Sequence, residues 1–152
     1  MLDKIAKVKH VWIRFLPALL MLLLIFGFSA QNDEESSETS TATTITIAHL
    51  IHIELDAETV EAISGVVRTV AHFTEYLLLA GTCFFAIAIW PMRPLVRYGG
   101  LELFCAVYAV SDELHQYYVP GRWCQWQDML IDSMGAAFGL LLCFLWVHRR
   151  HR

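Results

Sequence analysis

Four long runs of apolar residues dominate the chain, and shorter polar stretches separate them. The first run covers residues 11–30, and the others cover residues 71–90, 98–118 and 127–147. A helix of about 20 apolar residues crosses a hydrocarbon core of roughly 30 Å. The pattern therefore predicts an all-α membrane protein with four transmembrane helices.

The first apolar run has an alternative interpretation as a secretory signal peptide. Ala30 suits a cleavage site, but Phe28 two positions earlier does not, and the apolar stretch is long for such a peptide. Pro17 lies in the first turns of the run, where a membrane helix tolerates it. We therefore interpret residues 1–30 as an N-terminal cytoplasmic tail followed by the first transmembrane helix.

The chain between the first two apolar runs changes character twice. Residues 31–44 are acidic and rich in hydroxyl groups with nothing to bury, which predicts a solvated linker. A short, mildly apolar piece follows and carries His49 and His52, which we interpret as solvated loop residues rather than ligands. We assign residues 31–55 to an acidic extracytoplasmic linker.

An amphipathic helix is predicted just ahead of the second apolar run. Asp56 is a suitable N-cap, and Glu58 would lie in the first turn, near the positive end of the helix dipole. Apolar residues then recur at helical spacing and form one stripe: Val60, Ile63, Val67 and Val70. The stripe predicts a helix that lies at the membrane surface and leads into the second span. With the three later spans it forms a core over residues 56–147, and residues 148–152 form a basic tail.

The composition agrees with a protein that is surrounded by lipid. The chain is 57% hydrophobic and 17% charged, with a mean hydropathy of +0.49, and a soluble domain of this length needs less apolar material for its core. We therefore expect membrane lipids and no nucleic acid among its partners. The cysteines show no paired spacing, which predicts neither a disulfide nor a zinc–thiolate site. They are Cys83, Cys105, Cys124 and Cys143.

Basic and acidic residues are segregated along the chain. In a four-span arrangement, nine basic residues fall on one side: Lys4, Lys7, Lys9, Arg14, Arg93, Arg97, Arg149, Arg150 and Arg152. Only Arg68 and Arg122 fall on the other side, where most of the acidic residues between positions 31 and 70 also lie. The positive-inside rule then predicts a multi-pass membrane protein with both termini cytoplasmic and the acidic segment outside.

This topology brings the ends of three spans to the outer face, and each end carries polar residues. They are His72, Glu75, Tyr76, Asp112, Glu113, Gln116, Arg122, Asp128 and Asp132. Spacings of three or four residues place the members from each helix on one face. Gly135 and Gly139 continue the face that carries Asp128 and Asp132, and they would let another helix approach closely. The faces are therefore predicted to point into the bundle.

Some polar residues near the span ends have simpler explanations. Aromatic and imidazole side chains suit the interface between membrane and water, and here they are His115, Tyr117, Tyr118, Trp123 and Trp126. Arg122 would neutralise neighbouring acids, and Glu102 would lie near a helix end in cytoplasmic water. Asp132 has no such explanation, because it lies more than a turn inside its span. Several carboxylates at one depth require cations, hydrogen bonds or shared protons, which favours a functional site.

The polar segments resemble the VanZ-like family. The resemblance rests on V-R-T-V-A-H-F-T-E-Y-L-L-L-A at residues 67–80, S-D-E-L-H-Q-Y-Y-V-P-G-R at 111–122 and Q-D-M-L-I-D-S-M-G-A-A-F-G at 127–139. The segment I-F-G-F-S-A-Q at residues 25–31 is similar to the family's opening. The family pattern carries over onto the nine polar residues named above and onto Gly121 and Gly135. The chain departs from it at Thr69, where Lys is frequent, and at Asp132-Ser133, where Asn is common.

The resemblance implies a role at the cell envelope, because the founding member is associated with low-level resistance to teicoplanin in Gram-positive bacteria. A first hypothesis is a protein without catalytic activity, whose outer-face pocket binds a lipid-linked cell-wall precursor or a lipoglycopeptide. Arg122 would supply the contact to an anion.

Two other hypotheses stay open at this point. A small membrane hydrolase or transferase would use His72, Glu75, Asp112, Glu113 and Asp128 as catalytic candidates. With Asp132 they form an oxygen-rich set that suits a divalent metal ion, or one carboxyl would serve as a general acid or base. The chain contains no nucleophile elbow, phosphate loop or His-Glu-x-x-His motif. A proton- or cation-coupled carrier of this size would have to form a homo-oligomer.

Overall fold

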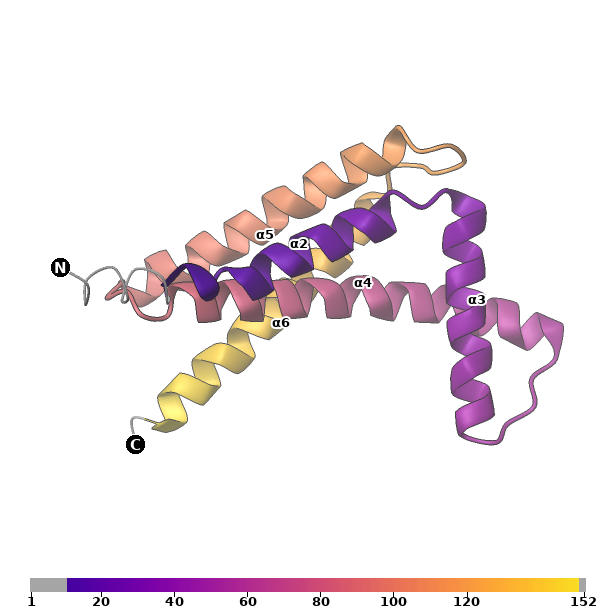
Figure 1. Ribbon diagram of the computed structural model, residues 1–152, viewed down its shortest axis with the longest axis horizontal. Coiled ribbons are helices and arrows are strands. Elements are labelled where there is room, and N and C mark those ends of the chain that lie inside the picture. Colours follow the sequence, from indigo (N-terminus) through magenta and orange to yellow (C-terminus); the bar gives the residue numbers. More distant parts are fainter. Residues whose placement is uncertain (1–10, 151–152) are drawn as a thin grey trace.

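The computed structural model describes residues 11–150, and within that range the chain forms helices and no strand. The helices are α2 (Leu16–Ser29), α3 (Asp33–Leu50), α4 (Ala57–Ile87), α5 (Pro94–Tyr117) and α6 (Trp126–Arg150). Helices α2, α4, α5 and α6 run along the length of the molecule, and α3 crosses one end of it (Figure 1). The predicted all-α membrane fold is confirmed.

Three helices are long and apolar enough to cross a membrane. Within the described residues they cover Val11–Ser29, Ala57–Ile87 and Trp126–Arg150, which correspond to the first, second and fourth predicted spans. Helix α5 exists where the third span was predicted, and it contacts α2, α4 and α6. It does not reach the same hydropathy because it carries charged residues along its length, so the count of four spans is not confirmed. Those residues are Arg97, Glu102, Asp112 and Glu113.

The prediction of a solvated linker over residues 31–55 is wrong for most of that segment, because residues 33–50 form helix α3. Asn32 caps the helix: its side chain accepts the Glu35 N–H at 2.9 Å, and the Glu35 carboxylate accepts the Asn32 N–H at 3.0 Å. This reciprocal pair is a capping box, which satisfies two backbone N–H groups at the helix start. The acidic, hydroxyl-rich composition indicated a linker, and the Asn-x-x-Glu spacing of a capping box was overlooked.

Helix α3 also buries one face, although it has few large apolar residues. Small side chains four residues apart lie against α4, namely Ser36, Ser40, Thr44 and Ala48. Their hydroxyl groups are satisfied within the protein. Ser40 and Thr44 donate to the carbonyl groups one turn earlier, and the Ser64 hydroxyl of α4 donates to Thr44 Oγ1 at 3.2 Å. Residues that looked unable to pack therefore form a close helix–helix contact.

Helix α4 joins two elements that were predicted separately. Asp56 is its N-cap, as predicted, and accepts the Thr59 N–H at 2.8 Å, with Glu58 in the first turn. The helix then continues without a break through the second span to Ile87. The amphipathic stretch is therefore not a separate surface helix. It extends the span beyond the bundle and passes α3 (Figure 1).

The close approach predicted at Gly135 and Gly139 is confirmed. A Cβ atom on Gly135 would collide with the carbonyl oxygen of Phe73, and one on Gly139 would lie 2.5 Å from the carbonyl oxygen of Leu77. The backbone of α6 thus lies directly against that of α4. Because Phe73 follows His72, this contact also sets the position of the polar residues of both helices.

Basic residues gather at the end of the bundle that holds the N-terminal end of α2 and the C-terminal end of α6. The Arg14 guanidinium donates to the carbonyl of Phe85 near the end of α4, and Arg97 donates to the carbonyl of Trp90 at 2.6 Å. Arg149 and Arg150 end α6 at the same side of Figure 1. The remaining basic residues of the predicted cytoplasmic side include some outside the described range, namely Lys4, Lys7, Lys9 and Arg152.

Candidate functional site

A buried polar cluster lies at the opposite end of the bundle. We define it by five residues whose side chains are at most 5% exposed: Tyr76, Asp112, Glu113, Gln116 and Asp132. They come from α4, α5 and α6, and each lies on the inward face that helical spacing predicted. His72, Glu75, Arg122 and Asp128 are partly buried around them. The structure thus brings polar residues from all three predicted span ends to one end of the molecule.

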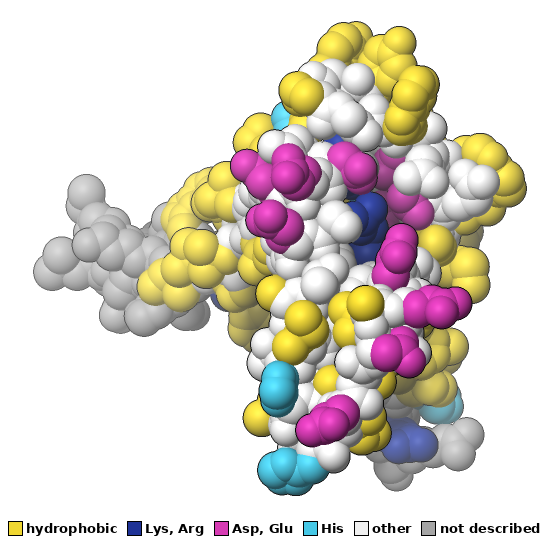
Figure 2. All heavy atoms as spheres, turned by 90° about the vertical axis from the view of Figure 1, so that its right-hand side faces the viewer, with side chains coloured by type: hydrophobic (Ala, Val, Ile, Leu, Met, Phe, Trp, Pro, Cys, Tyr) yellow, Lys and Arg dark blue, Asp and Glu magenta, His cyan; other side chains and the backbone are white. Residues whose placement is uncertain are grey.

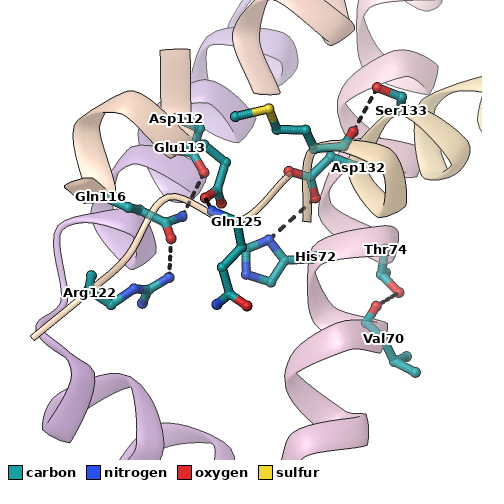
Figure 3. A network of polar contacts seen from close by, with 11 residues as sticks. Val70, His72, Thr74, Asp112, Glu113, Gln116, Arg122, Gln125, Asp132 and Ser133 are labelled. Atoms are coloured by element: carbon teal, nitrogen blue, oxygen red, sulfur yellow. Dashed lines mark hydrogen bonds and ion pairs between the residues drawn. The ribbon is translucent and has the colours of Figure 1, made fainter. Parts of the chain in front are cut away.

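Arg122 reaches into the cluster through Gln116. Its guanidinium donates to Gln116 Oε1, and Gln116 Nε2 donates in turn to Asp112 Oδ2 at 3.1 Å (Figure 3). Gln116 follows Asp112 by one helical turn, so α5 alone positions this pair. Arg122 lies in the connection between α5 and α6, and the contact ties that connection to the bundle.

Glu113 holds the same connection by a second contact. The backbone N–H of Gln125 donates to Glu113 Oε2 at 2.8 Å (Figure 3). Glu113 Oε1 is buried and has no hydrogen-bond partner among the described residues. One carboxylate oxygen therefore anchors the loop, and the other remains free to accept a hydrogen bond. Sequence reasoning missed Gln125, because a backbone N–H leaves no signal in the side-chain pattern.

His72 and Asp132 form the contact between α4 and α6. His72 Nδ1 lies 3.3 Å from Asp132 Oδ1, which is the distance of an ion pair when the imidazole is protonated (Figure 3). The alignment does not meet the geometry of a hydrogen bond, so both Asp132 oxygens are buried without a hydrogen-bond partner in the described part of the chain. The carboxyl predicted to be the hardest to explain structurally is thus only partly compensated.

Tyr76, Glu75 and Asp128 complete the surroundings of this pair. The Tyr76 hydroxyl is fully buried and has no hydrogen-bond partner within residues 11–150. It lies within electrostatic reach of both Asp112 and Asp132. Glu75 and Asp128 lie within electrostatic reach of His72. All nine predicted site residues therefore lie at this end, and five of them are joined by direct contacts.

A second arginine meets Arg122 at the surface above the cluster. Gly121 has a φ of +78°, a conformation that favours glycine, and a Cβ atom there would lie 3.2 Å from the Cβ of Asp33. Asp33 carboxylate in turn lies 3.8 Å from the Arg68 guanidinium. The loop that carries Arg122, the start of α3 and Arg68 thus meet, and we call Arg68 and Arg122 the arginine rim.

The electrostatic surroundings of Arg122 reflect this position. Burial lowers the pKa of Arg122 and the neighbouring Arg68 charge lowers it further, whereas Glu113, Asp112 and Asp128 raise it. An arginine stays protonated at physiological pH in spite of such shifts. Figure 2 shows this end of the molecule, where acidic side chains surround a basic group and apolar side chains lie further out.

A groove with a volume of about 700 Å³ opens between α3 and α4 and borders the arginine rim at Arg68. Its lining combines hydroxyl groups with small apolar side chains, including Ser37, Ser40, Thr41 and Val60. The nine predicted pocket residues do not line it. Sequence reasoning missed the groove because it treated the segment that became α3 as a linker.

Some predicted interfacial residues are exposed, and one is not. Trp123, Trp126, Tyr117 and Tyr118 are exposed, as interfacial anchors are. His115 is half-buried instead: its Nδ1 lies 3.2 Å from Ser29 Oγ. Glu102 is also half-buried in the first turns of α5, and one of its oxygens is enclosed without a partner among the described residues. His49 and His52 are exposed.

The donor side chains do not converge in the way a metal site requires. Within residues 11–150, no group of three or more His, Cys, Asp and Glu side chains is arranged to hold a metal ion. The four cysteines are free in the structure.

A protein-family model described as VanZ/LLP1 matches residues 15–147, which include all five helices nearly in full. No curated protein matches the chain, and no solved structure does. The matched range contains the buried polar cluster, the arginine rim and both glycines of the α4–α6 contact.

Proposed function

The chain belongs to the VanZ/LLP1 family, and on that premise we propose that it binds a lipid-linked or lipophilic ligand at the outer face of the bacterial cytoplasmic membrane. In this proposal both termini are cytoplasmic, and the arginine rim contacts an anionic group of the ligand. Binding of a cell-wall precursor or of a lipoglycopeptide would contribute to resistance against teicoplanin-type antibiotics.

The distribution of charge supports this orientation. Arg14, Arg97 and Arg150 lie at one end of the bundle, and the acidic first turn of α3 lies at the other. Basic residues remain on the cytoplasmic side of membrane proteins. The buried polar cluster and the groove would accordingly open toward the outside, where lipid-linked precursors are used and glycopeptides act.

The convergence of Arg68 and Arg122 beside the groove is the observation that carries the proposal. A guanidinium has five N–H donors, and the contact from Arg122 to Gln116 uses one side of it. Arg68 has only a long, exposed contact to Asp33, which an incoming phosphate or carboxylate would displace. The groove would take the polar part of the ligand, and the exposed apolar faces of the helices would border its acyl chain.

Replacement of Arg122 by lysine tests the proposal. Lysine keeps the charge but lacks the planar fork that binds an anion through two hydrogen bonds. We expect Arg122→Lys to unfold within about 1 kcal/mol of the wild type, while the resistance that it confers on a teicoplanin-susceptible Gram-positive host falls to background. Growth inhibition by teicoplanin is the measurement, with a glycopeptide that lacks an acyl chain for comparison.

Arg97→Lys is the matched control, because Arg97 donates to a backbone carbonyl at the opposite end of the bundle. It should leave resistance unchanged. Full resistance in the Arg122→Lys variant would contradict a role of the arginine rim in anion binding and would leave Arg122 as a charge-balancing residue.

A further inference from the structure

The buried polar cluster contains more hydrogen-bond acceptors than donors. Four of its oxygen atoms are enclosed without a partner in the described part of the chain: both oxygens of Asp132, Glu113 Oε1 and the Tyr76 hydroxyl. Gln116 and Arg122 already donate to Asp112 and Gln116, so the Tyr76 hydroxyl and a protonated His72 Nδ1, which are themselves without a partner, are the donors left nearby for the carboxylate oxygens. Buried polar groups are nearly always paired, so this surplus calls for a donor from outside the chain.

The charge balance points in the same direction. Five carboxyl groups lie at this end, and they are Glu75, Asp112, Glu113, Asp128 and Asp132. Arg122 and a protonated His72 offset at most two of them. A buried carboxyl group without a cation or hydrogen bonds takes up a proton, so a donor that also carries positive charge would stabilise this cluster in its ionised form.

Tyr76 gives an independent indication, because it is not an acid. Its hydroxyl is 0% exposed and unpartnered among residues 11–150, although the charges of Asp112 and Asp132 both reach it. A buried tyrosine hydroxyl normally finds a partner. The hydroxyl, which can both donate and accept, is therefore a further unpartnered group, and it comes from α4 rather than from α5 or α6.

We propose that the buried polar cluster binds a primary ammonium group, carried by a ligand whose phosphate lies at the arginine rim. A phosphoethanolamine headgroup of a membrane lipid has both groups at this short separation. The ammonium would donate to Asp132, Glu113 and the Tyr76 hydroxyl, and three N–H donors suit these acceptors. This inference rests on the proposed function, since it assigns the second half of the same ligand.

In this proposal the ligand reaches the cluster by displacing the connection between α5 and α6. Residues 118–125 cover the cluster, and two hydrogen bonds tie them to it, namely those from Arg122 to Gln116 and from Gln125 to Glu113. Displacement of this segment opens the cluster toward the outer membrane surface without any change in the α4–α6 contact. The exposed Trp123 in the same segment reports such a movement by its fluorescence.

Lipid binding by the full-length purified protein tests the inference. The protein is transferred to nanodiscs that contain phosphatidylethanolamine, phosphatidylcholine or phosphatidylglycerol at equal fraction in an otherwise identical bilayer, and lipid affinity is followed by Trp fluorescence and thermal unfolding. Phosphatidylcholine has the same charges but no N–H donor, and phosphatidylglycerol has hydroxyl donors but no cation. We expect phosphatidylethanolamine to bind at least about tenfold more tightly than either, as charged hydrogen bonds imply.

Tyr76→Phe removes one acceptor without a change in charge, and it should reduce this preference several-fold while the protein still folds. Tyr98→Phe is the matched control, because Tyr98 packs against Phe84 and Phe144 near the start of α5, at the other end of the bundle from the cluster. It should fold and leave the lipid preference unchanged. Equal loss of preference in both variants would overturn the assignment of the ammonium to this cluster.

The other outcomes are equally decisive. Equal binding of phosphatidylethanolamine and phosphatidylcholine would overturn the inference, and so would tighter binding of phosphatidylglycerol. Stabilisation by free phosphoethanolamine in detergent would support the ammonium site and show that the acyl chains are dispensable. The two proposals can fail separately. If the protein shows no lipid preference but Arg122→Lys still abolishes resistance, this inference is refuted and the proposed function stands.

Discussion

Replacement of Gly135 by alanine should lower the stability of the protein, because close packing of α6 on α4 opposes the gain in helix propensity that alanine brings. The added Cβ would collide with the Phe73 carbonyl oxygen, and both partners are backbone atoms that cannot rotate away. Overpacking of this kind costs about 1–3 kcal/mol, and sometimes more. Alanine also favours a helix over glycine by about 1 kcal/mol. A visible loss of stability in Gly135→Ala therefore means that the collision exceeds this gain.

Gly81→Ala is the matched control, since Gly81 also lies inside a helix but no atom lies within 4 Å of a Cβ built there. It should leave stability unchanged or raise it by up to about 1 kcal/mol. Both variants would be unfolded thermally and with denaturant in the same detergent micelles. Because Phe73 is adjacent to His72, Gly135→Ala should also disturb the contact between His72 and Asp132. If it melted like Gly81→Ala, the close approach of α4 and α6 would be refuted.

Three further predictions concern the outer segment. Asn32→Ala should cost about 1 kcal/mol because it removes the capping box, and hydrogen exchange should then speed up in the first turns of α3. The hydrogen bond from the Thr59 N–H lowers the pKa of Asp56. The N-cap therefore stabilises α4 fully above the unfolded pKa of Asp56, about 3.9, and this stabilisation is lost as pH falls through the lower folded pKa. Amide hydrogen exchange at the start of α4 should then become faster. In intact cells, a cysteine at Ser37 should be labelled from outside and one at Met92 should not; labelling at Met92 would contradict the proposed orientation.

The helices with strong apolar periods could be predicted from the sequence, and the one without could not. Spans appear as long apolar runs because lipid contacts most of their surface, and the Asp56 N-cap follows from one side chain and one backbone N–H. Helix α3 has no such run. It depends on the reciprocal bonds of Asn32 and Glu35 and on Ser40 and Thr44 lying against α4, and small polar side chains in that role look the same in a sequence as a solvated linker.

Helical spacing placed the right residues at one end but could not pair them. The i to i+4 relation predicted Asp112 with Gln116, which bond directly. The contact of His72 with Asp132 needs the register of α6 on α4, and Gly135 sets that register only in three dimensions. Arg122 was expected to neutralise neighbouring acids, and it lies within electrostatic reach of three of them, but its direct contact is to Gln116, which the sequence pattern did not predict.

The placement of charge by depth gives the two halves of the proposed site different expected roles. At the surface, Arg68 and Arg122 lie in contact with water, so an anion gains attraction there at little desolvation cost and can exchange readily. In the interior, Asp132 and Glu113 have buried oxygens without a hydrogen-bond partner among residues 11–150, so each compensating hydrogen bond has a larger effect. A ligand that used only the rim would be weakly held and poorly discriminated. A ligand that also fills the interior must match the donor deficit of the cluster, and specificity should therefore depend on Tyr76 and Asp132 more than on the arginines.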